Sequence, residues 1–497
     1  MSVLVVGGGL TGLTAAWALG RAGVPTLLVE ASDRLGGKVR TERTDGFLVE
    51  HGPDSFVAYR PAALELCREL GLGEAIIGVT EPRVVHIRTG GRFVPLPAGM
   101  GLVLPTRVAP FVTTPLFSYG QKLRASLDLF LPRLSEAGDV SIGAFLQRRL
   151  GRAVVDRLAG PLLGGVYGTG IDELSLDAVV PQLRESERLH RSLMLASLAA
   201  GRARAAGARS GGGGPGTSAG SPFVTLAGGT GQLVGALSAS IARMADVRVR
   251  TGVRVVALER QGGRSIVVLS DGERLRPEAI VLATPAPVTA GILEATAPAA
   301  SVALRSIPYG STGVVSLGFH VDQFPEAVVG HGFLVAGDEP LAISAATFSS
   351  RKWSGRAPEG MVLIRAFLGS TGESLLAGSD DEVVAAVRRD LAATMGVRGE
   401  PALVRVARWV NAMPHYAVGH LDRVAAACSA LAGYPDLALA GAAYRGVGMP
   451  DCVGQGRAAV EAILSGGGAT ADWAEGTEGA GEARGAGVEA AVRRGAA

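Results

Sequence analysis

Cysteine and aromatic side chains are scarce in this 497-residue chain, and neither positive nor negative charge is in large excess. The three cysteines, Cys67, Cys428 and Cys452, are far apart and form neither a CxxC motif nor a Cys/His ligand set. Their spacing argues against a disulfide framework and a metal site, and it is typical of reduced core residues. The net charge is +3, and no long basic run is interleaved with aromatic residues. We therefore exclude a nucleic-acid-binding protein.

Long hydrophobic runs are also missing, because no stretch of 18 or more residues is apolar enough to cross a bilayer. The longest uncharged stretches, residues 93–106 and 108–121, are interrupted by proline and glycine. We interpret them as an apolar cap, and peripheral contact with a membrane surface stays an alternative. The first residues already predict a strand, so we expect no signal peptide and a cytoplasmic protein.

The first forty residues contain an apolar strand, a glycine-rich turn, a helix and an acid at a fixed distance. Residues 2–6 predict a buried strand, residues 13–22 a helix, and residues 26–29 a second strand that ends at Glu30. This is the βαβ dinucleotide-binding pattern, in which the helix N-terminus binds a pyrophosphate and the acid binds a ribose. The turn that would hold the pyrophosphate consists of Gly7, Gly8, Gly9, Leu10, Thr11 and Gly12.

A second glycine pair, Gly36-Gly37, follows at once between Arg34 and Lys38. A nicotinamide-binding domain has no need of this pair, whereas in a flavoprotein it lets the chain pass close to the cofactor while the two cations neutralise phosphates. A basic surface turn is the alternative. Residues 31–41 resemble the flavin amine oxidase superfamily, which includes amine oxidases, phytoene desaturases and porphyrinogen oxidases.

Further segments resemble one group within this superfamily, the porphyrinogen oxidases. Residues 50–56 (EHGPDSF) resemble the flavin-side loop of bacterial porphyrinogen oxidases of haem biosynthesis, and residues 441–452 resemble the second flavin motif of that family. Residues 161–168, 174–176, 408–409 and 413–416 also match its pattern. The resemblance covers about residues 1–465. It is strongest to the oxidases of Gram-positive bacteria that act on coproporphyrinogen III.

The resemblance implies an α/β fold, with a Rossmann-like FAD-binding domain in three chain segments, an inserted β-sheet substrate domain and a mainly helical cap. We assign residues 1–88, 223–300 and 405–465 to the FAD-binding domain, 89–206 to the cap and 301–404 to the substrate domain. Within the cap we expect helices over residues 121–131 and 184–200. The glycine-rich residues 207–222 predict a flexible linker, and residues 466–497 a disordered tail.

The resemblance also implies which residues contact a non-covalent FAD. Val253 would bind adenine through its backbone, Trp409 would pack beside the cofactor, and the amides of residues 447–449 would face the pyrimidine end of the flavin. Cysteine is missing from residues 411–415, where some amine oxidases attach their flavin. Besides the N-terminal turn, the implied contacts are Glu30, Ala31, Arg34, Gly37, Lys38, Gly52, Pro53, Asp54, Ser55, Val253, Trp409, Val447, Gly448 and Met449.

For the chemistry, the resemblance implies three two-electron oxidations of a porphyrinogen to a porphyrin, each followed by flavin reoxidation by dioxygen with release of hydrogen peroxide. Because the flavin carries the redox chemistry, we expect no catalytic residue of the protein and no metal. His415 is a possible base, but a structural role fits a lone histidine better. The candidate substrate contacts are Arg60, Val166, Tyr167 and Phe367.

Coproporphyrinogen III carries four propionates and suits an open polar pocket, so we favour it over protoporphyrinogen IX. An amine oxidase is the less favoured alternative. A transient contact with the downstream ferrochelatase is expected from the order of the pathway alone.

Overall fold

The computed structural model describes residues 1–97, 108–133, 138–209, 222–326, 328–369 and 372–465. The predicted tail, residues 466–497, lies outside the described residues, as do residues 210–221 of the predicted linker. Helix α10 (Leu193–Arg209) continues into the first residues that we had assigned to this linker.

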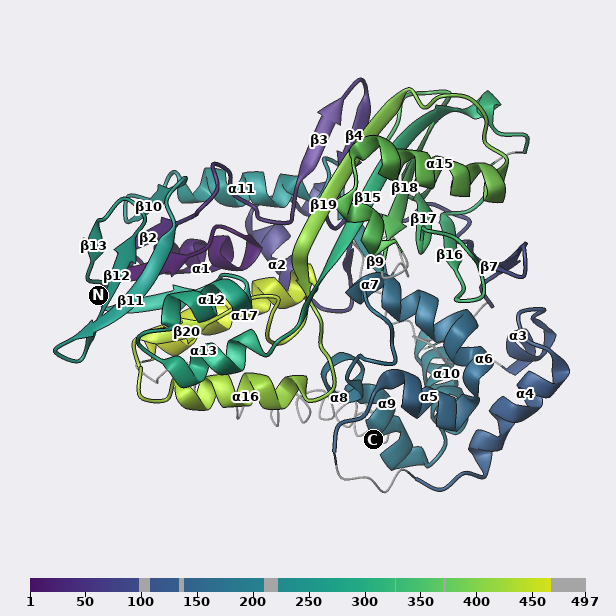
Figure 1. The fold of residues 1–497 in the computed structure, drawn as a ribbon, viewed down its shortest axis with the longest axis horizontal. Helices are drawn as coiled ribbons and strands as arrows, with labels where there is room; N and C mark the ends of the chain where they lie inside the picture. Colours follow the sequence, from purple (N-terminus) through teal and green to yellow (C-terminus); the bar gives the residue numbers. More distant parts are fainter. Residues whose placement is uncertain (98–107, 134–137, 210–221, 327, 370–371, 466–497) are drawn as a thin grey trace.

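A parallel five-stranded sheet forms the centre of one lobe (Figure 1). Its strands come from the two ends and the middle of the chain, and every neighbouring pair is parallel. The central strands are continuous apolar runs because helices cover both faces of the sheet. The Rossmann-like α/β fold that we expected is thus confirmed. In order across the sheet, the strands are β10 (Val247–Arg250), β2 (Thr26–Val29), β1 (Val3–Val6), β14 (Ala279–Leu282) and β20 (Leu437–Leu439).

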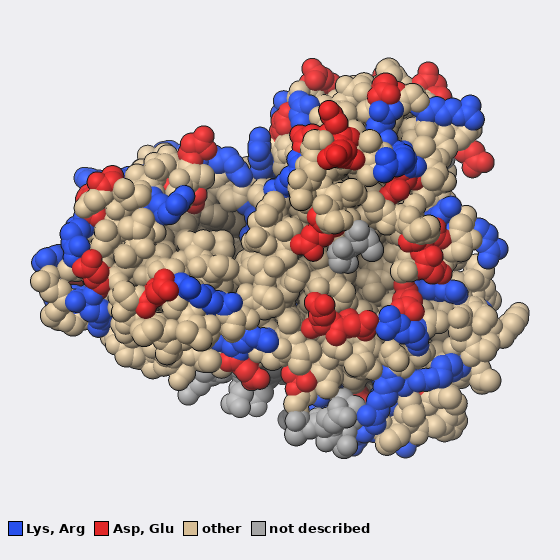
Figure 2. All heavy atoms as spheres, in the orientation of Figure 1, with Lys and Arg blue, Asp and Glu red and all other residues tan. Residues whose placement is uncertain are grey.

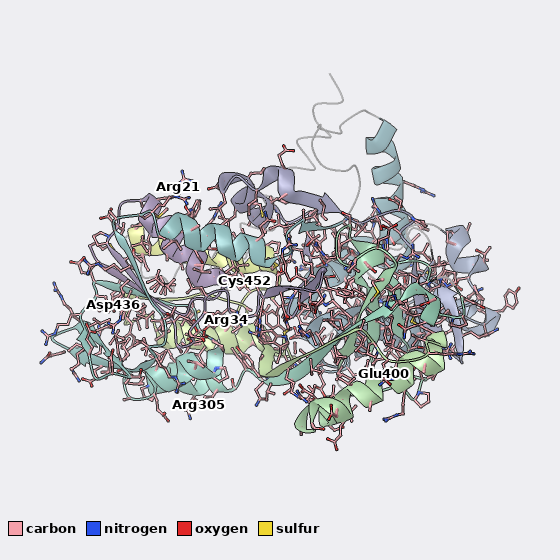
Figure 3. The ribbon with its side chains drawn as sticks, turned by 90° about the horizontal axis from the view of Figure 1, so that it is seen from above. Arg21, Arg34, Arg305, Glu400, Asp436 and Cys452 are labelled. Carbon is pink, nitrogen blue, oxygen red and sulfur yellow. The ribbon has the colours of Figure 1, made fainter. Side chains whose placement is uncertain are left out.

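Helices α1 (Leu10–Arg21), α11 (Gly231–Ile241) and α17 (Met449–Leu464) pack on one side of this sheet. The other side holds α12 (Ala286–Leu293), α13 (Pro298–Arg305) and α16 (His420–Ala430), as the two perpendicular views show (Figures 1 and 3). The first and last helices cross closely at Gly456, where an added Cβ would lie 2.6 Å from the carbonyl oxygen of Thr11. This crossing brings the two ends of the described chain together.

A seven-stranded sheet forms the second lobe (Figure 1). One face carries Val315, Leu317 and Ile364 and packs against α15 (Asp380–Met395). The opposite face carries Arg365 and Phe367. β19 crosses the boundary that we had expected at residue 404, and the division into domains stays a prediction. In order, the strands are β19 (Leu403–Pro414), β15 (Tyr309–His320), β18 (Met361–Leu368), β17 (Ala345–Phe348), β16 (Gly332–Val335), β7 (Val85–Thr89) and β8 (Arg92–Pro95).

Small strands join the two lobes. In the hairpin of β3 (Thr41–Thr44) and β4 (Phe47–Glu50), the Glu50 carboxylate accepts hydrogen bonds from the Thr41 hydroxyl (2.7 Å) and the Thr230 amide (2.7 Å). β5 (Phe56–Val57), β9 (Phe223–Leu226) and β6 (Ile76–Gly78) form a three-stranded sheet. β11 (Val255–Gln261), β12 (Arg264–Leu269) and β13 (Arg274–Leu275) form another three-stranded sheet, which lies at the end of the first lobe remote from the second (Figure 1).

The third part is helical and is formed from the range 89–206 that we assigned to a cap, although β8 at the start of this range belongs to the seven-stranded sheet. Its π-helical segment η3 (Val155–Gly164) leads directly into the short helix α7 (Gly165–Tyr167). The expected helix over residues 184–200 is divided, because Arg191 adopts a left-handed conformation (φ 63°). No helix among the described residues has both the length and the apolar character to cross a bilayer. The remaining α-helices among the described residues are α2 (Ala62–Glu69), which packs on α17, then α3 (Val108–Thr113), α4 (Tyr119–Ser126), α5 (Ile142–Leu150), α6 (Arg152–Val154), α8 (Leu176–Val179) and α9 (Pro181–His190) of the helical part, and α14 (Ser349–Lys352) beside the seven-stranded sheet.

Acidic and basic side chains are interspersed over the face shown in Figure 2, as the small net charge predicts. The same view shows a hollow between the lobe of the parallel sheet and the upper lobe that contains the β3–β4 hairpin. The residues described next converge on the junction of these lobes.

Candidate functional site

The glycine turn of residues 7–12 has the geometry that a bound pyrophosphate requires. Gly7 has a φ of +102°, and a Cβ on Gly12 would overlap the Gly7 carbonyl oxygen. The N-cap of α1 is Gly9, which offers no side-chain acceptor to the first-turn amides. These amides have no partner within the helix, so they are free to bind an anion at its positive end.

Two glycine variants test this turn. A Cβ on Gly9 meets no atom within 4 Å, so Gly9→Ala should change the stability of the flavin-free protein by less than about 0.5 kcal/mol. The methyl group should still weaken flavin binding more than about tenfold, because it occupies the line of closest approach to the pyrophosphate. Gly12→Ala should instead destabilise the fold itself. Denaturant unfolding and flavin titration separate the two effects, and wild-type flavin affinity in Gly9→Ala would contradict this placement.

Glu30 lies at the end of β2, beside the turn. Its Oε2 accepts a hydrogen bond from the Gly8 amide (2.6 Å), and its Oε1 accepts from the Ser32 amide (2.9 Å) and hydroxyl (2.7 Å). The carboxylate is therefore held in one orientation and keeps lone pairs for the hydroxyl groups of a ribose. The Glu30 carbonyl accepts from the Val253 amide (3.1 Å), so only the carbonyl of Val253 stays available to adenine.

The second glycine pair lies against the first. The Gly36 amide donates to the Gly8 carbonyl (2.8 Å), and a guanidinium nitrogen of Arg34 donates to the Gly37 carbonyl (2.7 Å). Burial lowers the pKa of Lys38, although the neighbouring Cys452 thiol opposes the shift. Burial in turn raises the pKa of Cys452, which belongs to α17 (Figure 3), to about 11. Segments more than 400 residues apart in sequence thus form one site.

The loop of residues 52–55 is held by its carbonyl groups. The amides of Gly52, Asp54 and Ser55 make no hydrogen bond to any described residue, so they are free to donate to a cofactor ring. Three side chains donate hydrogen bonds to successive backbone carbonyls at the start of this loop. Trp409 Nε1 donates to the carbonyl of His51 (2.8 Å), Arg365 Nη2 to that of Gly52 (2.6 Å) and Thr230 Oγ1 to that of Pro53 (2.9 Å).

The Asp54 carboxylate faces the seven-stranded sheet. It accepts from Lys352 Nζ (3.1 Å) and Trp353 Nε1 (3.1 Å), and Arg365 Nη1 lies 3.5 Å away. Burial alone would raise the pKa of Asp54, but Lys352 and Arg365 outweigh burial and hold it well below the usual range. Asp54 can therefore reach the predicted cofactor through its amide, while its side chain anchors the loop. Sequence reasoning missed these partners, although an arginine in the apolar strand 361–368 was an available signal.

The C-terminal motif ends at the start of α17. The N-cap is Gly448, whose amide donates to the Asp451 side chain (3.2 Å), while the amides of Val447 and Met449 have no partner in the described part of the chain. Asp451 also forms an ion pair with Arg60. The motif therefore presents unpaired donors at a second helix N-terminus.

Two candidate substrate residues come from different parts of the fold, Tyr167 from α7 and Phe367 from β18. The ring of Tyr167 packs 5.9 Å from that of Tyr416, and Phe367 lies beneath the Arg365 guanidinium (5.2 Å). Thr312 lies between the Trp409 side of the cofactor site and the loop that follows Tyr167. It is the partner of Trp409 in the pairing of β15 with β19, and a Cβ on Gly168 would lie 3.9 Å from the Thr312 Cβ. Burial raises the pKa of Tyr167 to about 12, so this phenol stays protonated at neutral pH and is not a base there. The side chain of Val166 lies outside the described residues.

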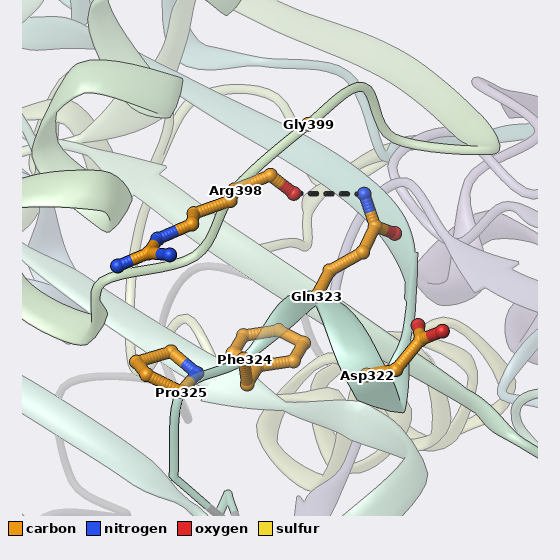
Figure 4. A pocket seen from close by; sticks show the side chains of 6 residues that line it. All are labelled: Asp322, Gln323, Phe324, Pro325, Arg398 and Gly399. Atoms are coloured by element: carbon orange, nitrogen blue, oxygen red, sulfur yellow. Dashed lines mark hydrogen bonds between the residues drawn. The ribbon is translucent and has the colours of Figure 1, made fainter.

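A surface hollow of about 350 Å³ lies elsewhere, and none of the predicted site residues line it. It lies beside Gln323, whose side chain donates to the Arg398 carbonyl (2.9 Å), at the end of β15 remote from Tyr309 (Figure 4). The lining residues are Asp322, Gln323, Phe324, Pro325, Arg398 and Gly399.

His420 predicts a pH dependence of stability. It is fully buried, and burial lowers its pKa to about 4, with Arg423 also lowering it and the Tyr444 carbonyl and Asp139 opposing. Unfolding restores a pKa near 6.5, so this contribution is complete above that value and is lost as the pH falls toward 4, in total about 3 kcal/mol. His420→Gln should remove this part of the slope in urea unfolding between pH 7 and 4. An unchanged slope would contradict the assignment.

Comparison with known proteins gives one family and, within it, porphyrinogen oxidases. The family model for flavin-containing amine oxidoreductases matches residues 10–464. A coproporphyrinogen III oxidase of Propionibacterium freudenreichii subsp. freudenreichii is 46% identical, with 93% of this chain and 90% of that protein covered. The coproporphyrinogen III oxidase of Bacillus subtilis (strain 168) is 36% identical, with 93% and 98% covered. The structure of a protein from Exiguobacterium sp. 255-15, assigned as a protoporphyrinogen oxidase, is 32% identical with a TM-score of 0.80, covering 93% and 98%.

Proposed function

Because this chain belongs to the flavin-containing amine oxidoreductase family, we propose that it is an FAD-dependent oxidase that converts coproporphyrinogen III to coproporphyrin III in haem biosynthesis. The reaction removes six hydrogens in three two-electron steps, and three molecules of dioxygen become three of hydrogen peroxide. The observation that carries the proposal is the 46% identity to a coproporphyrinogen III oxidase over 93% of the chain. The alternative substrate, protoporphyrinogen IX, is suggested by the Exiguobacterium neighbour.

The residues at the lobe junction fit a non-covalent FAD. When bound, the flavin accepts the hydride equivalents and passes the electrons to dioxygen. The free amides of the N-terminal turn would bind its pyrophosphate, Glu30 its ribose, and Arg34 and Lys38 its negative charge. The free amides of residues 52–55 and 447–449 would flank its ring. Cys67 and Cys428 are buried, and burial raises their thiol pKa values, which disfavours a covalent link.

Arg60 would bind a substrate propionate, with Tyr167 and Phe367 against the macrocycle. Loss of one charge-assisted hydrogen bond costs about 1.5 kcal/mol, so Arg60→Met should raise KM for coproporphyrinogen about tenfold with kcat nearly unchanged. Arg68→Met, an exposed cation on the helix that follows, is the control. An unchanged KM in Arg60→Met would show that the propionates bind elsewhere.

The experiment that tests the function uses the purified protein. After its flavin spectrum is recorded, coproporphyrinogen III is added under air, and porphyrin fluorescence and peroxide are followed together. Three peroxides per porphyrin support the proposal, and a yellow protein inert toward both porphyrinogens overturns it. Protoporphyrinogen IX and a primary amine, tested in parallel, decide between the substrate classes. A pull-down with ferrochelatase checks the expected partner.

A further inference from the structure

Tyr416 lies just beyond the last strand of the seven-stranded sheet, and only 1% of its surface is exposed. Its hydroxyl donates to the Ala442 carbonyl (2.8 Å) and accepts from the Gly446 amide (2.6 Å). These two backbone groups lie four residues apart within the turn of residues 440–448 between β20 and α17. One side chain therefore holds two positions of the segment that leads into the candidate cofactor helix.

His420, the first residue of α16, supports the same arrangement from four residues further along the chain. Its ring stacks on that of Tyr416, with centroids 3.8 Å apart and planes inclined by 13°. Its Nε2 lies 3.0 Å from the carbonyl oxygen of Tyr444, in the middle of the turn. Tyr416 and His420 together hold three backbone positions of residues 442–446.

Tyr416 is itself fixed by parts of the molecule outside this turn. Its carbonyl accepts a hydrogen bond from the Ser175 amide (2.7 Å), and Leu174 forms a β-bridge with Ala417. Its ring also packs against the candidate substrate residue Tyr167. The helical part and the seven-stranded sheet thus position the hydroxyl that holds the turn.

We propose that Tyr416 is a positioning residue for the flavin: by clamping residues 442–446 it fixes the direction of the Val447 and Met449 amides and of the α17 N-terminus. This inference rests on the proposed flavin site. Two-electron reduction with uptake of one proton leaves a negative charge on the ring, which oriented amides and a helix N-terminus stabilise. Hydrogen bonds weaken steeply when donors turn away, so a loosened turn should make the reduced flavin less stable.

The test compares Tyr416→Phe with Tyr434→Phe in the flavin-loaded protein. The Tyr434 hydroxyl also donates to a backbone carbonyl, that of Thr296 (2.5 Å), but Tyr434 precedes β20 whereas the turn follows it. Tyr416→Phe should lower the equilibrium constant for two-electron reduction at least tenfold, or roughly 30 mV by dye equilibration. Tyr434→Phe should leave the potential unchanged. In the flavin-free protein, the Gly446 amide should exchange hydrogen faster in Tyr416→Phe alone.

The outcomes separate this inference from the proposed function. A wild-type protein that takes up no flavin overturns the proposed function, whereas a flavin-loaded Tyr416→Phe with a wild-type potential overturns the positioning role alone. If Tyr416→Phe fails to fold, His420→Leu replaces it, since that variant removes the stacked ring and the Tyr444 contact but keeps the Tyr416 hydroxyl. It should lower the potential in the same direction, and an unchanged value counts against the inference.

Discussion

Glu30→Leu is expected to yield a folded, colourless protein that binds FAD more than about 100-fold more weakly than the wild type. The variant removes the acceptor for the Gly8 and Ser32 amides and, in the proposed complex, for the ribose hydroxyls. Hydrogen bonds to a charged group contribute about 1.5–3 kcal/mol each, so losing two costs at least about 3 kcal/mol. Flavin occupancy after purification and a titration of the flavin-free protein measure the effect.

Two further variants test whether the loss of FAD affinity comes from the Glu30 carboxylate itself. Asp33→Leu removes an exposed carboxylate three residues away and should keep full occupancy. Glu30→Gln keeps an oxygen acceptor but loses the charge, so its affinity should lie between those of the wild type and Glu30→Leu. Full flavin occupancy in Glu30→Leu would mean that the ribose lies elsewhere.

Arg149→Met is expected to destabilise the helical part by about 3–5 kcal/mol. The Arg149 guanidinium lies between Asp128 (3.3 Å) and Glu187, and all three side chains are at most 3% exposed. Asp128 also accepts from the Ser192 hydroxyl (2.7 Å) and the Met194 amide (2.9 Å). Without the cation, the Asp128 carboxylate stays buried after losing its ion-pair partner. Hydrogen exchange over α5 and α9, together with thermal unfolding, checks this expectation.

Arg148→Met is the matched control, because Arg148 is the preceding residue of the same helix and is exposed. It should change the unfolding free energy by less than about 0.5 kcal/mol. Equal stability of the two variants would show that the buried cation contributes nothing beyond the packing of its aliphatic chain.

The local patterns predicted elements whose type follows from the periodicity of apolar residues along the chain, whichever partners they later pack against. The strand of residues 3–6, its glycine turn and the helix after it follow from apolar periodicity and from glycine at positions where a side chain would overlap the backbone. The apolar runs of residues 314–319 and 361–367 likewise form parts of β15 and β18.

Long-range partners were not predictable in the same way. The residues next to Asp54 in the sequence do not indicate that Lys352 neutralises its carboxylate or that Trp353 donates a hydrogen bond to it. Both partners lie about 300 residues further along the chain. The break at Arg191 has no glycine or proline to signal it. It follows from Ser192 turning its hydroxyl to the buried Asp128, a tertiary requirement that overrides helix propensity.

The parallel sheet takes its outer strand β20 and the helix α17 from the last part of the described chain. During synthesis, β1 and β14 leave the ribosome well before residues 437–464, so β14 has an open edge and α1 an uncovered apolar surface until those residues have been made. A nascent chain in that state is exposed to aggregation and proteolysis. Chaperone occupancy and cofactor loading should therefore depend on completion of the final helix, and premature termination should leave a degradable fragment.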